Sequence, residues 1–411
     1  MIVIEYKIKG KQKQFQGIDE AIRTGQFVRN KALRYWMDNR GVNKYDLNKY
    51  CAVLAKEFDF ASRLNSTARQ SSAERAWSGI SRFYKNCREN KPGKKGYPKF
   101  KKHSRSVEFK KSGWKLDPET KKHITFTDKN NIGRLKLVGS RDIYFYQPEQ
   151  IQRVRLVRRA DGYYVQFCIS IEVKEDIKPS GKAIGLDMGL KYFLSDSFGN
   201  TEENPRFYRK AEKKLNRLNR KKSLKYSKQR KRNKQRQSNN YHKARKRYSL
   251  AHLRVSRQRK DHAVKLARSV CTSNDCIVYE DLKVRNLVRN SKLAKSITDA
   301  GWTQFRSWVE YYGWKMGKIT VAVPPHYTSS DCPKCNKRVK KSLSTRTHAC
   351  ECGCVMDRDH AAAIQILKKG LNTVGHTGIY AWGDLPTWAV GANLLSNGES
   401  LNQESPSSND S

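Results

Sequence analysis

Alternation of apolar and polar residues predicts short β-strands at two places in the first part of the chain. Met1–Lys11 alternates through its isoleucines and tyrosine, which is typical of one half-buried strand. The same period of two returns between Ser106 and Val173, where Asp161-Gly162 is typical of a tight hairpin. The apolar pairs of these later strands are Val107/Phe109, Ile124/Phe126, Leu135/Leu137, Ile143/Phe145 and Val154/Leu156. Several short strands joined by turns favour a small β-barrel, which the first strand would join.

Between these strand regions the apolar residues recur at helical spacing. Residues 15–40, 44–58 and 61–87 each carry an apolar face, and Pro92-Gly-Lys-Lys-Gly96 ends the last helix. Arginines line the polar face of residues 61–87, which favours a solvated face and a nucleic-acid-binding face equally. The helices therefore form an insertion, residues 13–100, between the strands of the barrel.

The second half of the chain predicts a different fold, an α/β domain that begins after Lys178-Pro-Ser-Gly181. An apolar strand that starts at Ala183 is interrupted by Asp187, and a later short strand, the fourth of this domain, contains Glu280. The later elements are a helix over 298–315, a strand over Ile319–Val323 and an apolar helix that begins near Asp359. This order, with acids on the first strand, the fourth strand and a late helix, is the RNase H-like arrangement.

Asp187, Glu280 and Asp359 are the candidate catalytic residues. A lone Asp at the end of an apolar strand is usually a cap or turn residue, so purely structural acids are the alternative. Buried carboxylates that lie together repel one another unless a cation neutralises them, and Mg²⁺ prefers oxygen ligands. Two Mg²⁺ ions about 3.5–4 Å apart can activate water and stabilise the leaving oxygen of a phosphodiester. The pattern favours a nuclease that binds two catalytic Mg²⁺ ions through these carboxylates.

Half of the ten cysteines lie in one short segment just before Asp359. Cys332-x2-Cys335 and Cys350-x-Cys352 provide four thiolates on two tight turns, which suits one tetrahedral Zn²⁺ ion, with Cys354 as an alternative ligand. Four cysteines leave no open coordination position, so a structural zinc ribbon is expected. The remaining cysteines are expected to be buried free thiols: Cys51, Cys87, Cys168, Cys271 and Cys276.

The charge of the chain predicts nucleic acid as its partner. The 85 Lys and Arg residues exceed the 38 Asp and Glu residues, giving a net charge of +47, while 8 Trp and 20 Tyr argue against a ribosomal or histone-like protein. Residues 206–260 hold 24 Lys and Arg and one acid, and their recurring Leu and Tyr favour long nucleic-acid-binding helices over a solvated insert. Neither a signal peptide nor a membrane-spanning run is expected, which favours a cytoplasmic, nucleoid-associated bacterial protein without a membrane partner.

Seven segments form an ordered set of motifs along nearly the whole chain. They are Phe27-Val-Arg-Asn-Lys, Lys95-Gly-Tyr-Pro-Lys-Phe100-Lys, Ile184-Gly-Leu-Asp187-Met-Gly-Leu-Lys, Tyr279-Glu280-Asp-Leu, Ser296-Ile-Thr-Asp-Ala-Gly-Trp302-x-x-Phe305, Thr328-Ser-Ser-Asp-Cys332-x-x-Cys335 and Asp357-Arg-Asp359. In this order they resemble TnpB, the family of RNA-guided DNA nucleases of IS200/IS605-type transposons and relatives of the type V CRISPR effectors.

The resemblance implies a multidomain α+β fold and specific partners. It implies a β-barrel wedge domain (1–12 and 101–180), a helical recognition domain (13–100), a RuvC-like nuclease domain (181–327 and 357–372, with a basic helical insertion at 206–260), a zinc ribbon (328–356) and a largely disordered tail (373–411). Asp187, Glu280 and Asp359 match the RuvC carboxylates. A guide RNA from the protein's own element would pair with target double-stranded DNA beside a short flanking motif, which the protein reads near Gln70 and Lys110. The oligomeric state stays open.

The chain departs from the family pattern at two positions. The family usually follows its last catalytic Asp with x-Asn-Ala-Ala-x-Asn, whereas Asp359 is followed by His360-Ala361-Ala-Ala-Ile-Gln365. Asn336 replaces the common Gly after the first cysteine pair, and Asn tolerates the positive φ of such a turn. The intact acids favour an RNA-guided, Mg²⁺-dependent DNA endonuclease, whereas Ala361 favours a guide-directed DNA-binding protein with weak or lost nuclease activity. A guide-independent basic nucleic-acid-binding protein is the third hypothesis.

Overall fold

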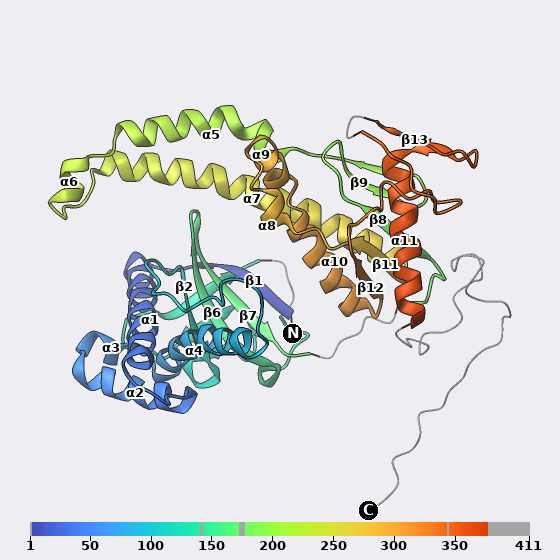
Figure 1. The fold of residues 1–411 in the computed structure, drawn as a ribbon. Helices are drawn as coiled ribbons and strands as arrows, with labels where there is room; N and C mark the ends of the chain where they lie inside the picture. The colour runs from blue at the N-terminus through green and yellow to red at the C-terminus, as the bar shows by residue number, and fades with distance from the viewer. Residues whose placement is uncertain (1, 140–142, 172–176, 343–344, 377–411) are drawn as a thin grey trace, which may run out of the picture. The chain divides into compact units, whose positions relative to one another are not determined.

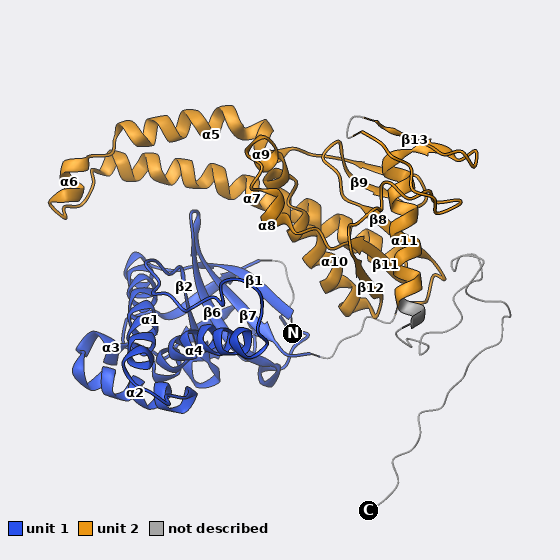
Figure 2. Ribbon diagram, viewed as in Figure 1, with its two compact units in different colours: residues 1–172 blue, residues 173–411 orange. Residues whose placement is uncertain are grey.

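The computed structural model describes residues 2–139, 143–171, 177–342 and 345–376. The chain divides into two compact units, Met1–Glu172 and Val173–Ser411 (Figure 2). The division lies a few residues before the boundary at 180 that the sequence predicts. Each unit is built around its own sheet and its own apolar core, so each is described by itself.

The first unit is built on a seven-stranded antiparallel sheet with the order β2-β6-β7-β1-β5-β4-β3 (Figure 1). The strands are β1 (Ile2–Lys9), β2 (Ser106–Lys110), β3 (Trp114–Leu116), β4 (His123–Phe126), β5 (Gly133–Val138), β6 (Ile151–Arg159) and β7 (Gly162–Ile169). The end strands β2 and β3 are joined only by a three-residue 3-10 helix, Lys111–Gly113, so the sheet curls back on itself. Phe109 on β2 and Phe126 on β4 consequently have ring centroids only 4.9 Å apart. As predicted, the first strand joins this sheet, between β5 and β7.

Two details of the predicted strands are wrong. Ile143 is buried, but Phe145 is 81% exposed and the segment forms a turn, so this apolar pair does not mark a strand. The hairpin loop consists of Ala160 and Asp161, because Arg159 already pairs with Gly162. Gly162 has a φ of 136°, which explains why glycine follows the loop.

Four helices lie between β1 and β2 in the sequence, where the helical insertion is predicted. They are α1 (Gln12–Asp38), α2 (Lys44–Glu57), α3 (Asp59–Arg63) and α4 (Ser66–Arg88). The predicted single helix over 61–87 is divided, because Asn65 caps α4 by accepting a hydrogen bond from the backbone N–H of Thr67 (2.8 Å). Cys87 on α4 is exposed, contrary to the prediction of a buried thiol, whereas Cys51, Cys168, Cys271 and Cys276 are buried.

The second unit contains a five-stranded sheet with the order β10-β9-β8-β11-β12. The strands are β8 (Ala183–Asp187), β9 (Tyr192–Asp196), β10 (Thr201–Glu203), β11 (Cys276–Glu280) and β12 (Ile319–Val323). Strands β8, β11 and β12 are parallel, whereas β9 pairs antiparallel with β8 and β10. Helix α11 (Arg358–His376) lies against this sheet (Figure 1). It continues past the predicted end of the domain at 372, and residues 377–411 of the predicted tail lie outside the described residues.

The basic block forms helices, as the sequence favours. Helices α5 (Phe207–Leu224) and α7 (Asn239–Ser273) run side by side as a long hairpin, with the short α6 (Lys228–Arg232) at its tip (Figure 1). Asp299 anchors its base by accepting hydrogen bonds from the backbone N–H groups of Tyr208 and Arg209 and from the side chain of Arg259.

Three further helices follow β11 in the second unit: α8 (Val284–Leu287), α9 (Ser291–Ala300) and α10 (Trp302–Met316). The helix predicted over 298–315 therefore begins later than expected, because Gly301 adopts a φ of 74° between α9 and α10. None of the helices formed by the described residues is long and apolar enough to cross a membrane.

Candidate functional site

Two of the predicted catalytic acids lie at the same edge of the five-stranded sheet. Strands β8 and β11 are parallel neighbours, and Leu186 is paired with Tyr279. Asp187 and Glu280 are the next residues on the two strands and end them together. The strand register therefore brings these two carboxylates side by side, although more than 90 residues separate them in the sequence.

The third acid reaches this edge from the first turn of α11. Asp357 caps the helix, since its Oδ1 accepts the backbone N–H of Asp359 (2.8 Å). The helix can approach β8 because residue 185 is glycine: a Cβ atom there would lie 2.1 Å from the backbone oxygen of Ala363. Burial, followed by the charges of Glu280 and Asp359, raises the pKa of Asp187 well above its usual range. Asp187, Glu280 and Asp359 thus form one interacting group, the carboxylate site.

The side chains around the carboxylate site are ones that sequence reasoning missed. Thr328 donates a hydrogen bond to Glu280, and burial raises the pKa of Glu280 although this bond and Lys369 oppose the shift. Asp359 forms ion pairs with Arg358 (3.0 Å) and Arg346 (3.7 Å). Thr328 lies in the motif that contains Cys332, and Arg358 lies in the motif Asp357-Arg-Asp359. Only the fold shows which acid each of them contacts.

The donor set of the carboxylate site fits Mg²⁺. It consists of carboxylate oxygens, the ligands that this ion prefers, and the pKa of Asp187 is raised first by burial and then by the charges of Glu280 and Asp359, both of which a bound cation would offset. Within the described residues, the carboxylate oxygens do not all lie within 4.8 Å of one another, in contrast to the cysteine sulfurs described next.

Cys332, Cys335, Cys350 and Cys352 form a second group, the cysteine site. Their Sγ atoms all lie within 4.8 Å of one another, with 3.6 Å between Cys332 and Cys352 and 3.5 Å between Cys335 and Cys350. The second pair lies in the turn between β13 (Thr347–Ala349) and β14 (Val355–Asp357). Four sulfur ligands from two tight turns fit a tetrahedral Zn²⁺ ion.

Cys354 belongs to a different group from the four cysteines of the cysteine site. Its Sγ lies within 4.8 Å of Cys332 and of buried His348, in a set that shares only Cys332 with the cysteine site. The geometry therefore favours Cys352 as the ligand and places the alternative, Cys354, beside it.

The two departures from the family pattern meet at the contact between α11 and the first cysteine turn. Asn336 has a φ of 58°, the left-handed conformation expected for a residue in place of glycine. The buried Gln365 donates from Nε2 to the backbone oxygen of Cys332 (2.6 Å) and to Oδ1 of Asn336 (3.1 Å). The longer glutamine and the asparagine thus bind one another and hold the cysteine turn on the helix that carries Asp359.

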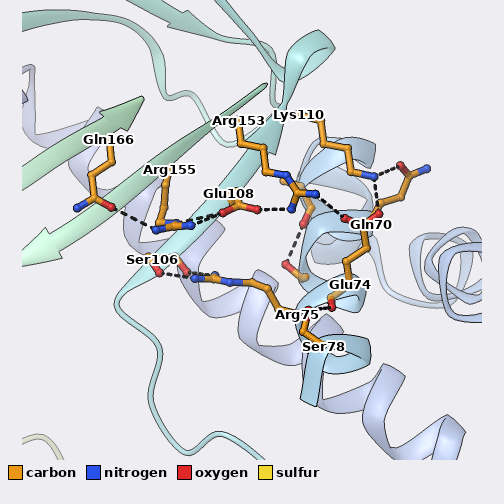
Figure 3. A network of polar contacts seen from close by, with 12 residues as sticks. Gln70, Glu74, Arg75, Ser78, Ser106, Glu108, Lys110, Arg153, Arg155 and Gln166 are labelled. Atoms are coloured by element: carbon orange, nitrogen blue, oxygen red, sulfur yellow. Dashed lines mark hydrogen bonds and ion pairs between the residues drawn. The ribbon is translucent and has the colours of Figure 1, made fainter. Parts of the chain in front are cut away.

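Gln70 and Lys110, the residues predicted to contact nucleic acid, lie together in the first unit (Figure 3). Nζ of Lys110 on β2 donates to Oε1 of Gln70 on α4 (3.4 Å) and pairs with Glu74 (2.8 Å). Arg153 from β6 also reaches Glu74, so the pair belongs to a larger charged network.

Comparisons with known proteins agree with the motifs. The family described as OrfB_IS605, probable transposase, matches residues 166–291, and the Cas12f1-like TNB domain matches residues 302–366. A "Putative RNA-guided DNA endonuclease" of Streptomyces pristinaespiralis is 34% identical over 50% of this chain and 50% of its own length. The "Putative RNA-guided DNA endonuclease InsQ" of Escherichia coli K12 is 28% identical over 66% of this chain and 67% of its own length. The chain thus spans about half the length of the first of these relatives.

The fold also has a counterpart among solved structures. The Cas12f1 chain in the cryo-EM structure of the Cas12f1-sgRNA-target DNA complex aligns with a TM-score of 0.53 and 12% sequence identity, covering 87% of this chain and 83% of that chain. At this identity the likeness concerns the fold, which is a mixed α/β, multidomain, Cas12-like one. In sequence the chain is similar to OrfB_IS605 and Cas12f1-like TNB domains and to proteins named RNA-guided DNA endonucleases, which agrees with the resemblance of its motifs to the TnpB family.

Proposed function

We propose that this chain is an RNA-guided DNA endonuclease that cuts beside a short flanking motif. The observation that carries the proposal is the convergence of Asp187, Glu280 and Asp359, from two parallel strands and a later helix, on one edge of a sheet. The strand order β10-β9-β8-β11-β12 suits an RNase H-like, RuvC-type nuclease domain. The names of the two curated relatives support the same activity.

Each acid would have a defined role in phosphodiester hydrolysis. Asp187, Glu280 and Asp359 would together hold the two Mg²⁺ ions through their carboxylate oxygens. Thr328 orients Glu280 by its hydrogen bond. When bound there, a pair of Mg²⁺ ions supplies activation of water and stabilisation of the leaving oxygen. Asp359 is paired with Arg358 and Arg346, which would compete with a metal ion for its oxygens.

The remaining parts of the chain would hold the nucleic acids. We assign the first unit to the wedge and recognition domains and the cysteine site to a structural zinc ribbon. The hairpin of α5 and α7 carries much of the +47 charge, which would bind a guide RNA from the protein's own element and the guide–target duplex through their phosphates. Gln70 and Lys110 would read the flanking motif.

A guide-directed DNA-binding protein without efficient cleavage is the second candidate. Ala361 is buried in the first turn of α11, where the family usually has an Asn, and it offers no polar group to orient Asp359 or substrate. The two arginines paired with Asp359 compete with a metal ion for its oxygens. Both features would slow cleavage without affecting guide-directed binding.

Cleavage of a plasmid library separates the two candidates. The chain, co-expressed with the RNA transcribed beside its gene, is given a guide-matched target next to random flanks, with and without Mg²⁺ and beside Asp187→Ala. We expect cutting that depends on the flank and on Mg²⁺ and is lost in Asp187→Ala. Flank-specific binding without any cutting would establish the second candidate. Binding that requires neither guide nor flank would contradict both.

A further inference from the structure

Two carboxylates are buried beneath the charged surface formed by α4, β2 and β6 of the first unit. The side chain of Glu74 on α4 is 11% exposed and that of Glu108 on β2 is 4% exposed. Glu74 pairs with Lys110 (2.8 Å), and Glu108 pairs with Arg155 (2.7 Å). Arg153 connects the two acids, with its guanidinium 2.9 Å from Glu108 and 3.5 Å from Glu74 (Figure 3). The result is one continuous network of alternating charges.

This network keeps a positive charge that it does not neutralise itself. Among the described residues, four cationic side chains pair with the two carboxylates: Lys44, Lys110, Arg153 and Arg155. Burial opposes ionisation of Glu108, but hydrogen bonds from Arg155 and Arg153 outweigh it and hold the pKa of Glu108 below its usual range. The acids are therefore charged at neutral pH, and the surface has an excess of cations over anions.

The acids and the cations differ in exposure. The side chain of Arg153 is 42% exposed and that of Lys44 is 46% exposed, while the carboxylates lie below them. The two acids therefore hold four cations that remain 29–46% exposed to solvent. Long cationic side chains ordinarily lose rotamer freedom when they bind a partner, and ordering them beforehand removes that cost. The surface is consequently a preordered array for an anionic partner.

We propose that Glu74 and Glu108 are positioning residues that hold Arg153, Lys110 and Gln70 in a fixed array for the phosphates and base edges of duplex DNA. This inference rests on the proposed function and deepens it, because it explains how a flanking duplex is bound selectively. Lys110 bonds Gln70 directly, and a glutamine amide is a ligand for adenine in the major groove.

The test uses variants that change charge and geometry separately. Glu74→Gln and Glu108→Gln each remove one negative charge, and Arg153→Lys keeps the charge but loses the fork that bridges both acids. Glu20→Gln is the matched control, because Glu20 is a partly exposed acid of the same unit, paired with Arg23 outside the network. For each guide-loaded variant, binding to the guide-matched random-flank library without Mg²⁺ measures flank preference. Binding to a short random-sequence duplex over a range of salt concentrations measures general affinity.

Flank preference and general affinity should not fall together in any network variant. We expect each network variant to lose about tenfold or more of the flank preference, the size of one lost specific contact. General affinity should stay constant in Arg153→Lys and increase in the Glu→Gln variants, since each gains a positive charge. The control should share the gain in affinity but keep the flank preference.

Three results would overturn the inference. In the first, flank preference is unchanged in the network variants while general affinity rises, which would mean that the two carboxylates only balance charge. The surface binds the guide instead if the variants lose RNA and keep flank preference. A wild-type complex without any guide-directed binding would reject the proposed function itself, and this inference with it. Thermal unfolding of each variant is measured in parallel, and the exposed Arg153→Lys variant decides the matter if a buried Glu→Gln variant does not fold.

Discussion

The cysteine site and the carboxylate site lie in the same unit but are assembled in different ways. The four cysteines lie within 20 positions of one another, on two tight turns, and their sulfurs are mutually within 4.8 Å. The three acids come from β8, β11 and α11, and only the sheet order and the helix contact bring them together. The first site is thus local, whereas the second is a property of the packed unit. A change in packing should damage the carboxylate site and spare the cysteine site.

The largest expected effect comes from removing a ligand of the local site. Cys335→Ser should abolish zinc binding, because structural zinc contributes on the order of 10–16 kcal/mol in zinc-finger peptides. Cys354→Ser should retain one zinc ion per chain, since Cys354 is outside the four-sulfur group. Zinc content of the purified proteins is the measurement. Zinc that survives Cys335→Ser but is lost in Cys354→Ser would assign the ion to Cys332, His348 and Cys354.

A smaller effect is expected when the packed site is disturbed without touching any ligand. In Gly185→Ala the new Cβ would lie 2.1 Å from the backbone oxygen of Ala363, so α11 must move away from β8. We expect a loss of about 1–3 kcal/mol of stability from overpacking. Cleavage should fall about 100-fold, the typical result of a misplacement of about 1 Å. Cleavage rate, melting temperature and zinc content are measured together, and zinc content should not change.

Gly79→Ala is the control for this experiment, because nothing lies within 4 Å of a Cβ at that position. Residue 79 lies inside α4, where alanine is favoured over glycine by up to about 1 kcal/mol. Normal cleavage by Gly185→Ala would show that the close approach of α11 to β8 does not determine the position of Asp359. Loss of zinc in the same variant would show that the cysteine site also depends on packing.

The smallest expected effect concerns the charge of the carboxylate site. The pKa of Asp187 is raised in the folded chain, so the folded state binds this proton more tightly than the unfolded state does. Its contribution to stability is therefore greatest at low pH and is lost as the pH rises from about 3.9, the unfolded pKa, through the folded pKa. Without metal at neutral pH, Asp187→Asn should melt at a higher temperature than the wild type, by about 2–4 °C for each kcal/mol of relieved repulsion.

Magnesium should reverse this order of stability. Added Mg²⁺ should raise the melting temperature of the wild type and leave that of Asp187→Asn nearly unchanged, because the ion relieves the repulsion only where all three charges are present. The difference between the two melting curves over pH isolates Asp187 from other titrating groups. A wild type that melts at the same temperature with and without Mg²⁺, or a difference that does not grow with pH, would contradict the proposed metal role.

The sequence by itself predicts the secondary structure where one periodicity dominates. The strand at Ile2–Lys9, the helices α1 and α2 and the acids at the strand ends all follow from spacing alone. The pattern does not predict the two places where one residue ends a helix and starts the next. Asn65 caps the start of α4, and Gly301, with its positive φ, separates α9 from α10. The exposed Phe145 shows the opposite case, in which an apolar pair has no packed neighbour and forms no strand.

The sequence by itself therefore determines three features of this protein. The cysteine site and the order of the elements depend on the spacing of near neighbours along the chain, and the positive charge depends on composition. The tertiary structure decides the rest: which residues face the acids, how Gln365 and Asn336 join the cysteine turn to α11, and how Glu74 and Glu108 order a cationic surface. These contacts join residues that are far apart in the sequence. Their partners are chosen by strand register and helix packing, which no local pattern records.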